Sequence, residues 1–464
     1  MIPMDFDWLA NVLTTDYQGD NQGDNQQVLN INTDTRTVCG GEVFLALKGP
    51  NFDGHKFIAE AKQKGAIGVI VQHKVDVDIP QFIVSDTRIA LGVIGTAVMA
   101  QVAPKTIAIT GSVGKTTVKE MCAAILSVHG DVLATRGNFN NDIGVPLTLL
   151  RLEPQHRFAV IELGANHLGE IAYTTAMTKP DVAVVCNVAA AHLEGFGSLM
   201  GVAKAKGEIF DGLKDDGVAI VNCDSEFSQY WLDKLEGRNV KRFSTTEKLD
   251  IWAENITLDA NARASFTLCT KDKQVPVTLA LPGKHNISNA LIAAALTSEF
   301  DVTLEEIANA LATMGDVKGR VNLIEVSDLL TVVDDTYNAN VKSVKAAIDL
   351  LSDMQGHRIL ALGDMGELGE DARKYHQEVG EYALEQGIDE LFTLGVLSKC
   401  ASDVFELPNR HFSSREQMQQ KIQESINKVN TKTTIVVKGS RSSRMELLVT
   451  DLVNGQQQAI NGVS

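Results

Sequence analysis

Short apolar runs alternate with amphipathic segments along most of this chain. Runs of this length that are rich in Val, Ile and Leu and end in polar residues or Gly are typical of buried strands. In the last third, strands are expected at 331–335, 358–364, 390–395 and 434–439, with helices near 343–351 and 375–386. Strands that alternate with helices in this way predict a Rossmann-like α/β domain.

The same alternation continues upstream and divides the chain into three units. In the middle, strands at 158–163, 181–188 and 217–223 are separated by helical stretches, which predicts a mainly parallel sheet covered on both faces. Near the start, strands at 41–49, 66–71 and 81–86 and a helix at 52–65 predict a small α/β unit. A chain of 464 residues is too long for one ordinary domain. We therefore expect an α/β protein with domains at 1–88, 89–317 and 318–464.

A glycine-rich loop between a strand and a helix is the strongest chemical signal. Residues 106–110 are apolar and β-branched, the loop 111–114 reads GSVG, and an apolar helical stripe follows as far as Gly130. A helix N-terminus offers free N–H groups to phosphate, Lys115 is placed to reach terminal phosphates, and the Thr116 hydroxyl suits Mg²⁺. The general phosphate-loop pattern has a glycine at position 109, where this chain has isoleucine and a later Gly111. The alternative is a tight turn with a solvated lysine.

Composition restricts the partners and the compartment. The chain is 44% hydrophobic, with neither a leader-like start nor an apolar run of membrane-spanning length, so we expect a soluble cytoplasmic protein without membrane insertion. A net charge of −17 argues against a nucleic-acid partner, which needs a basic face. The cysteines lack zinc-site or disulfide-framework spacing and are expected to be buried free thiols; they are Cys39, Cys122, Cys186, Cys223, Cys269 and Cys400.

Polar residues that follow the central strands are candidates for a metal site, because ligands gather at the carboxyl ends of parallel strands. Glu162 ends one strand and could share Mg²⁺ with Thr116, although a solvated strand-end glutamate is the alternative. His192 follows another strand, where a loop or capping histidine is the more common outcome.

Several further polar residues have both a binding and a purely structural interpretation. Amides and one carboxylate crowd a segment that could instead be an Asx-rich turn: Asn138, Asn140, Asn141 and Asp142. Asn286 and Asn289 lie one helical turn apart and could read a base edge, while Asn286 could also cap its helix. Asp334 and Asp335 end a strand and could accept from ribose hydroxyls or form a capping cluster.

The compact loop and its TTVKEM continuation resemble the ATP loop of the Mur ligases, cytoplasmic amide ligases that build the peptidoglycan peptide. Further segments carry the resemblance over nearly the whole chain: 137–150, 161–172, 187–198, 201–210, 282–296, 334–340 and 362–370. At Val341 the chain departs from the asparagine-proline usual in the family, which affects only the local turn.

The resemblance implies an ATP-dependent ligase with a UDP-binding domain, a central ATPase-like domain and a Rossmann-like C-terminal domain. The implied substrates are UDP-N-acetylmuramoyl-tripeptide and D-alanyl-D-alanine, joined through an acyl phosphate by a monomer that uses ATP and two Mg²⁺ ions. It also implies that His192 and a carbamylated Lys206 hold the second ion, with Lys204 as the less favoured register; a helical lysine in water is the alternative.

The resemblance also assigns individual site residues. ATP is expected at Gly111, Ser112, Val113, Gly114, Lys115, Thr116, Thr117, Asn286, Asn289, Arg320 and Asp335. Metal is expected at Thr116, Glu162, His192 and Lys206, and catalytic roles at Lys115, His192, Lys206 and Arg320. Substrate is expected at Arg36, Lys48, Gly49, Asn138, Asn141, Asn338 and Asp364, with Lys438, Ser440 and Arg441 as weaker candidates. Other ligases of the superfamily and a nucleotide-sensing protein are the competing hypotheses.

Overall fold

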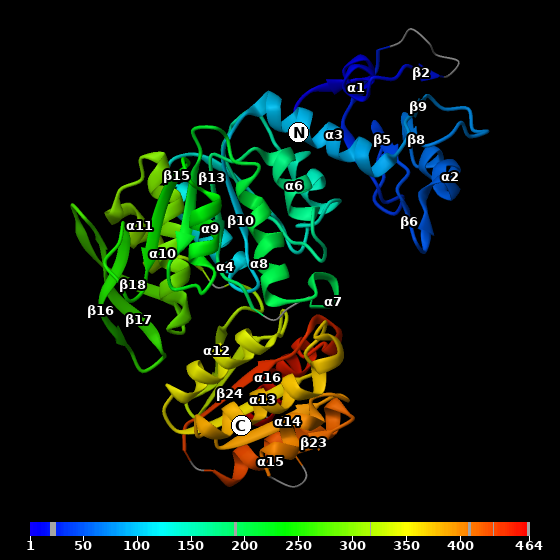
Figure 1. The fold of residues 1–464 in the computed structure, drawn as a ribbon. Helices are drawn as coiled ribbons and strands as arrows, with labels where there is room; N and C mark the ends of the chain where they lie inside the picture. Colours follow the sequence, from blue (N-terminus) through cyan, green and yellow to red (C-terminus); the bar gives the residue numbers. More distant parts are fainter. Residues whose placement is uncertain (19–24, 190–192, 316, 407–409, 430, 462–464) are drawn as a thin grey trace.

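The computed structural model describes residues 1–18, 25–189, 193–315, 317–406, 410–429 and 431–461. Three α/β units, each built on its own sheet, follow one another along the chain, and the central unit lies between the other two (Figure 1). The expected fold class is confirmed, with parallel pairing prevailing in all three sheets. No helix among the described residues has the length and apolar character needed to cross a bilayer.

The first unit is a five-stranded sheet in the order β2-β9-β8-β5-β4, with only β2 antiparallel to its neighbour. Its elements are β1 (Met4–Asp5), α1 (Phe6–Leu13), β2 (Tyr17–Gln18), β3 (Gln27–Val28), β4 (Asn30–Asn32), β5 (Glu42–Leu45), β6 (Lys48–Gly49), β7 (Phe52–Asp53), α2 (Ile58–Gln63), β8 (Gly68–Val71) and β9 (Gln81–Ile83).

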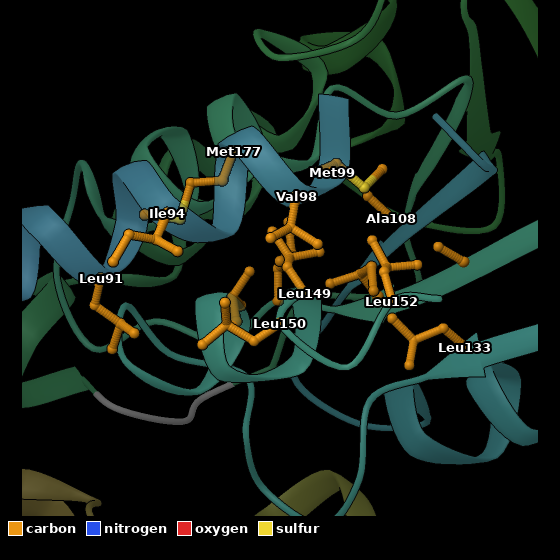
Figure 2. Packing of buried hydrophobic residues seen from close by; sticks show 14 of the residues in the cluster. Leu91, Ile94, Val98, Met99, Ala108, Leu133, Leu149, Leu150, Leu152 and Met177 are labelled. Carbon is orange, nitrogen blue, oxygen red and sulfur yellow. The ribbon is translucent and has the colours of Figure 1, made fainter. Parts of the chain in front are cut away.

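Helix α3 (Thr87–Val102) joins the first unit to the second. Asp86 caps its N-terminus by accepting from the backbone N–H groups of Arg88 and Ile89. Its buried residues Leu91, Ile94 and Val98 pack in one apolar cluster with Leu149 and other residues of the central unit (Figure 2). The same cluster includes buried residues of the first unit, so α3 ties the two units through a continuous core.

The central unit has a nine-stranded sheet in the order β11-β12-β10-β13-β14-β15-β16-β17-β18. Its elements are β10 (Lys105–Thr110), α4 (Lys115–Leu126), β11 (Asp131–Ala134), α5 (Gly144–Leu149), β12 (His156–Glu162), α6 (Glu170–Thr178), β13 (Val182–Val185), α7 (Leu193–Phe196), α8 (Leu199–Gly207), β14 (Val218–Asn222), α9 (Ser228–Lys234), β15 (Asn239–Ser244), β16 (Ile251–Leu258), β17 (Arg263–Thr270), β18 (Gln274–Pro282), α10 (His285–Thr297) and α11 (Leu304–Thr313).

The register of the central strands brings the candidate residues together. β10 lies between β12 and β13, with Ile109 opposite Glu162 and Thr110 opposite Val185. The phosphate loop, Glu162 and the segment after β13 therefore emerge at one edge of the sheet. The strands β16, β17 and β18 pair antiparallel and were not predicted from the sequence.

The third unit has a six-stranded sheet in the order β19-β20-β24-β21-β22-β23, in which only β19 is antiparallel. Its elements are β19 (Asn322–Ser327), β20 (Leu330–Asp335), α12 (Val341–Ser352), β21 (His357–Gly363), α13 (Ala372–Glu385), β22 (Glu390–Leu394), α14 (Lys399–Val404), β23 (His411–Phe412), α15 (Arg415–Lys428), β24 (Thr433–Lys438) and α16 (Glu446–Asn461).

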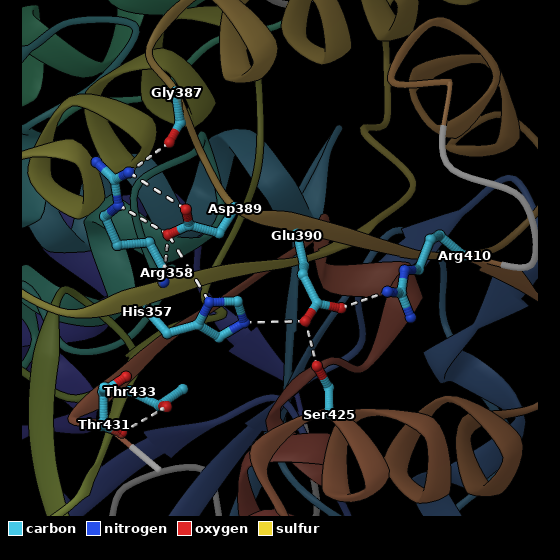
Figure 3. Close-up of polar contacts among 9 residues, drawn as sticks. All are labelled: His357, Arg358, Gly387, Asp389, Glu390, Arg410, Ser425, Thr431 and Thr433. Atoms are coloured by element: carbon cyan, nitrogen blue, oxygen red, sulfur yellow. Dashed lines mark hydrogen bonds and ion pairs between the residues drawn. The ribbon is translucent and has the colours of Figure 1, made fainter. Parts of the chain in front are cut away.

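The two ends of this third sheet have different polar chemistry. At the amino ends of β21 and β22, the buried Glu390 carboxylate accepts from His357 at 2.9 Å and pairs with Arg410 at 2.7 Å (Figure 3). At the carboxyl ends of β20 and β24 lie Asp335 and Lys438, which line the first of two cavities described below. The first cluster is structural, and the second belongs to the candidate site.

The cysteines only partly follow the expectation of buried thiols. Cys122, Cys186 and Cys269 are buried, as predicted. Cys39 is exposed, and Cys223 and Cys400 are half-buried, so the expectation is wrong for these three. All are free thiols.

Candidate active site

The phosphate loop starts where β10 ends and leads directly into α4. Gly114 precedes the helix with a φ of +83°, a left-handed conformation that favours glycine. A Cβ at this position would lie 2.6 Å from Asn289 Oδ1 on α10. The Lys115 ammonium folds back over the loop and donates to the Gly111 carbonyl at 2.8 Å. Burial lowers the pKa of Lys115 and nearby Arg320 adds to this, while the charge of Glu162 opposes it.

Asn187, two residues after the end of β13, holds the loop. Its Oδ1 accepts from the Val113 N–H at 3.0 Å, and its Nδ2 donates to the Val113 carbonyl at 2.9 Å. The Ser112 N–H also donates to the Asn187 carbonyl at 3.1 Å. Asn187 was not predicted from the sequence, although its position just after the 182–185 strand was a usable signal.

A carboxylate and a hydroxyl meet below the loop. Thr116 Oγ1 donates to Glu162 Oε2 at 3.0 Å, and Asn140 Nδ2 donates to Glu162 Oε1 at 2.9 Å. Glu162 is only 3% exposed, so the solvated strand-end alternative is wrong. The described residues contain no cluster of three or more His, Cys, Asp or Glu side chains that could enclose a metal. A single carboxylate with a hydroxyl fits Mg²⁺ shared with phosphate oxygens, because Mg²⁺ takes few protein ligands.

Lys206 on α8 points into the same region. It is 4% exposed, whereas Lys204 is exposed, so the alternative of a helical lysine in water is wrong for Lys206. Burial, reinforced by the charge of Lys115, lowers the pKa of Lys206 from 10.5 to about 7. His192, the other expected ligand, lies outside the described residues.

Two cavities open on either side of the phosphate loop. The first, of about 440 Å³, is lined by Thr117, Asn286 and Asn289 of the central unit and by Asp335 and Lys438 of the third unit. The second, of about 800 Å³, is lined by Lys115, Thr116, Glu162 and Lys206 and by Tyr337 of the third unit. The residues common to both are Val113, Gly114, Arg320 and Ser343. The end of the phosphate loop and Arg320 therefore separate the two cavities.

Asn286 and Asn289 are fixed in the wall of the first cavity. Asn286 Nδ2 donates to the Pro282 carbonyl at 2.7 Å, and Asn289 Nδ2 donates to Asn286 Oδ1 at 2.8 Å. α10 begins at His285 with Lys284 in the capping position, so Asn286 is not the helix N-cap. His285 also lines this cavity and was not predicted; burial lowers its pKa despite the nearby Asp335 carboxylate.

The aspartates at the end of β20 are not a capping cluster for α12, because Asn340 caps that helix in a capping box with Ser343. Asp335 Oδ2 accepts from the buried Lys438 ammonium at 2.5 Å, and burial lowers the pKa of Lys438. Asp334 accepts from the Thr336 hydroxyl at 2.5 Å. Asp335 thus presents an ion-paired carboxylate to the first cavity.

The candidate asparagines lie along the second cavity. Asn138, Asn141 and Asn338 all line it. Asn141 Oδ1 also accepts from the Gly144 N–H at 2.8 Å at the start of α5, so the Asx-turn interpretation holds for this residue alongside its place in the cavity. Arg441 lines the same cavity and was one of the weaker candidates.

Four of the substrate candidates lie away from both cavities. The Arg36 side chain is 85% exposed and pairs with Asp34 at 2.6 Å, and this hydrogen bond lowers the pKa of Asp34 to about 2. Lys48 and Gly49 form the exposed strand β6 of the first unit. The Asp364 carboxylate accepts from the backbone N–H groups of Val396, Leu397 and Ser398 at 2.7 to 3.0 Å, which ties the β22–α14 loop.

Arg320 crosses from the third unit to the phosphate loop. Its Nη2 donates to Thr116 Oγ1 at 3.3 Å, and its guanidinium lies over the Tyr337 ring at 4.1 Å from the centroid. Together with Lys115 it brings two cations to the loop, next to the carboxylate–hydroxyl pair of Glu162 and Thr116. This set of groups suits transfer of a phosphoryl group between ligands in the two cavities.

Known protein families match this chain between residues 27 and 441. Residues 109–297 match the family described as Mur ligase middle domain, and residues 319–441 match the Mur ligase, glutamate ligase domain. Residues 27–129 match the Mur ligase family, catalytic domain.

Relatives of known name span nearly the full length. A protein of Escherichia coli (strain K12) named "UDP-N-acetylmuramoyl-tripeptide--D-alanyl-D-alanine ligase" is 47% identical over 438 residues, which are 94% of this chain and 96% of that protein. A solved structure of MurF from Acinetobacter baumannii superposes with a TM-score of 0.93 at 36% identity, covering 98% of this chain and 99% of that one. MurF of Thermotoga maritima, solved in complex with ADP, has a TM-score of 0.83 at 26% identity, covering 93% and 98%.

Proposed function

Because this chain belongs to the Mur ligase family, we propose that it joins D-alanyl-D-alanine to UDP-N-acetylmuramoyl-tripeptide at the expense of ATP. The products are the UDP-linked pentapeptide, ADP and phosphate. The Escherichia coli relative carries this activity in its name, and the match covers 94% of this chain.

The observation that carries the proposal is the partition of the site by the phosphate loop and Arg320. The first cavity presents the buried amides of Asn286 and Asn289 and the carboxylate of Asp335, which suit a base and a ribose. The second presents Lys115, Thr116 and the amide-rich segment, which suit a terminal phosphate and the carboxylate of a peptide. A nucleotide that lies across the loop would place its γ-phosphate at the boundary between the two.

The reaction follows from this arrangement. A carboxylate oxygen of the tripeptide attacks the γ-phosphorus, and the bond to ADP breaks. Lys115 and Arg320 stabilise the negative charge on the transferring phosphoryl oxygens. The amine of the dipeptide then attacks the acyl carbon, and the carbon–oxygen bond to phosphate breaks as the peptide bond forms. Both steps need a site closed to water, because an acyl phosphate hydrolyses readily.

Thr116 and Glu162 would hold a Mg²⁺ ion, and we further propose that a second ion is held by His192 and a carbamylated Lys206. When bound, these ions neutralise phosphate charge and orient the phosphoryl oxygens. Carbamylation needs a neutral amine, and the lowered pKa of Lys206 supplies one near pH 7. The carbamate formed on Lys206 carries oxygen atoms that can bind Mg²⁺, whereas an ammonium group cannot bind a metal.

The remaining assignments belong to the same proposal. The first unit would bind the UDP moiety through Arg36, Lys48 and Gly49, which lie on its exposed surface. The third unit would receive the dipeptide near Asn338, with Asp364 shaping a neighbouring loop. We propose the domain boundaries 1–88, 89–317 and 318–464, a monomer, and a cytoplasmic location, where ATP and nucleotide-linked precursors are made.

The test is phosphate release from ATP with UDP-N-acetylmuramoyl-tripeptide, with and without D-alanyl-D-alanine, for tripeptides that end in lysine or meso-diaminopimelate. We expect release only when both substrates are present. Release with a single amino acid in place of the dipeptide would favour another ligase of the superfamily. ATP binding without release under any condition would favour a nucleotide sensor.

A further inference from the structure

Arg320 has an unusual set of contacts for a half-buried cation. Its guanidinium meets the Thr116 hydroxyl and the Tyr337 ring, and its Nε is buried with no hydrogen-bond partner among the described residues. No ion pair joins it to a carboxylate in the described part of the chain. The guanidinium is therefore held in place without a direct ion pair.

The backbone on both sides of Arg320 is constrained. Gly319 has a φ of +68° and Val321 a φ of +53°, the latter an uncommon conformation for a β-branched residue. The Arg320 N–H donates to the Val317 carbonyl at 2.9 Å and closes the turn. Strain of this kind persists only where the surrounding structure enforces it. The turn fixes the Cα of Arg320, but its long side chain needs a further support.

Tyr337 provides that support from the segment after β20. Its N–H donates to the Gly319 carbonyl at 3.1 Å, so its backbone is attached to the same turn that carries Arg320. A Cβ on Gly319 would lie 3.3 Å from Tyr337 Cβ, so the two segments are in close contact. The ring then lies beneath the guanidinium at 4.1 Å. Backbone and side chain of Tyr337 thus fix both ends of Arg320.

We propose that Tyr337 is a positioning residue, which holds the Arg320 guanidinium at the boundary between the two cavities and leaves its charge available to the transferring phosphoryl group. A carboxylate partner would direct the guanidinium as well but would cancel most of its charge. An aromatic face attracts a cation through its quadrupole and carries no net charge. This inference rests on the proposed ligase function.

The experiment is a double-mutant cycle on the full-length enzyme with Tyr337→Leu, Arg320→Ala and the double variant, alongside Tyr337→Phe. Steady-state phosphate release gives kcat and the KM for ATP with the tripeptide and dipeptide saturating. Tyr382→Leu is the matched control, because Tyr382 also contacts a cation, Lys345 at 5.0 Å, on the third unit but lines neither cavity.

We expect Tyr337→Leu to lower kcat about 5- to 30-fold, the scale of a partly desolvated cation–π contact. Tyr337→Phe keeps the ring and should stay within about threefold of wild type, and Tyr382→Leu within about twofold. In the Arg320→Ala background, Tyr337→Leu should cost less than about twofold more, because a residue that acts through Arg320 has nothing left to position.

Two results would overturn the positioning role: equal losses in Tyr337→Phe and Tyr337→Leu, or losses that multiply in the double variant. A wild-type enzyme without dipeptide-dependent phosphate release would instead overturn the proposed ligase function. In that case the Kd for MgATP is measured for the same four proteins of the double-mutant cycle. Independent effects of the two substitutions on this Kd would count against Tyr337 acting through Arg320.

Discussion

Replacing Gly114 by alanine is a sharp test of the phosphate-loop geometry, because the chain offers a control with the same backbone conformation. Gly114 has a φ of +83° and its added Cβ would lie 2.6 Å from Asn289 Oδ1. Gly237 has a φ of +81° and no atom within 4 Å of its added Cβ. Both variants place an alanine in the left-handed backbone conformation, but only in Gly114→Ala does the added Cβ clash with a neighbouring side chain.

The magnitudes follow from these two terms. A left-handed alanine costs about 1 to 2 kcal/mol of folding free energy at either position. At Gly114 the clash must also displace the Asn289 amide, which donates to Asn286 at 2.8 Å. Leaving a buried polar group unpaired costs about 1 to 3 kcal/mol more. Asn289 and the loop both line the first cavity, so the clash should weaken ATP binding as well. A loss of about 1 to 3 kcal/mol in binding free energy raises the Kd for ATP about 5- to 150-fold.

Calorimetric titration with MgATP and urea unfolding measure the two quantities on the same proteins. We expect Gly237→Ala to lose stability but keep the wild-type Kd, and Gly114→Ala to lose both stability and affinity. Equal ATP affinity in the two variants would refute the close approach of Gly114 to Asn289. A large loss of affinity in Gly237→Ala would show that general destabilisation, rather than the loop, controls binding.

Three further predictions concern single charged groups. Glu162→Gln should lower kcat by about 100-fold and raise the Mg²⁺ concentration needed for half-maximal rate, because the carboxylate that suits the ion is lost; an unchanged Mg²⁺ titration would contradict this. With ¹³C-bicarbonate, a carbamate NMR signal should grow from pH 6 to pH 8, because the neutral amine fraction of Lys206 rises from about 0.1 to about 0.9 around a pKa of about 7. Lys206→Met should abolish the signal and Lys204→Met should keep it; a signal that survives in Lys206→Met would disprove the assignment. Glu390→Ala should lower the unfolding free energy by about 3 kcal/mol in urea titrations, because it removes the buried carboxylate that pairs with both Arg410 and His357 (Figure 3); an unchanged midpoint would show that the network is not stabilising.

The strand–loop–helix around Lys115 could be predicted because the signal is local. Glycines, lysine and threonine at fixed spacing after a β-branched strand leave few alternatives, and the loop lies at the start of α4 as predicted. The position of Glu162 followed from the rule that strand ends in a parallel sheet share an edge. The same rule applied to Asn187 would have found the residue that holds the loop.

Contacts between the units could not be predicted from the sequence. Nothing local indicates that Arg320 reaches Thr116, a residue 204 positions earlier, or that Tyr337 lies under it. The burial of Lys206 likewise depends on which side of α8 faces the sheet, and a nine-residue helix with two lysines does not reveal this. The antiparallel strands β16 to β18 were not predicted, because polar and apolar residues alternate along them. The other strands were predicted from continuous apolar runs, which are typical of buried parallel strands.

The most direct test of the proposed chemistry follows oxygen atoms through one turnover. UDP-N-acetylmuramoyl-tripeptide labelled with ¹⁸O in both oxygens of its terminal carboxylate is incubated with ATP, D-alanyl-D-alanine and the enzyme, and phosphate and peptide product are weighed by mass spectrometry. Attack of the carboxylate on the γ-phosphorus predicts one ¹⁸O in each phosphate released and one retained in the new amide. Unlabelled phosphate, or a peptide product without the added dipeptide, would contradict ligation through an acyl phosphate.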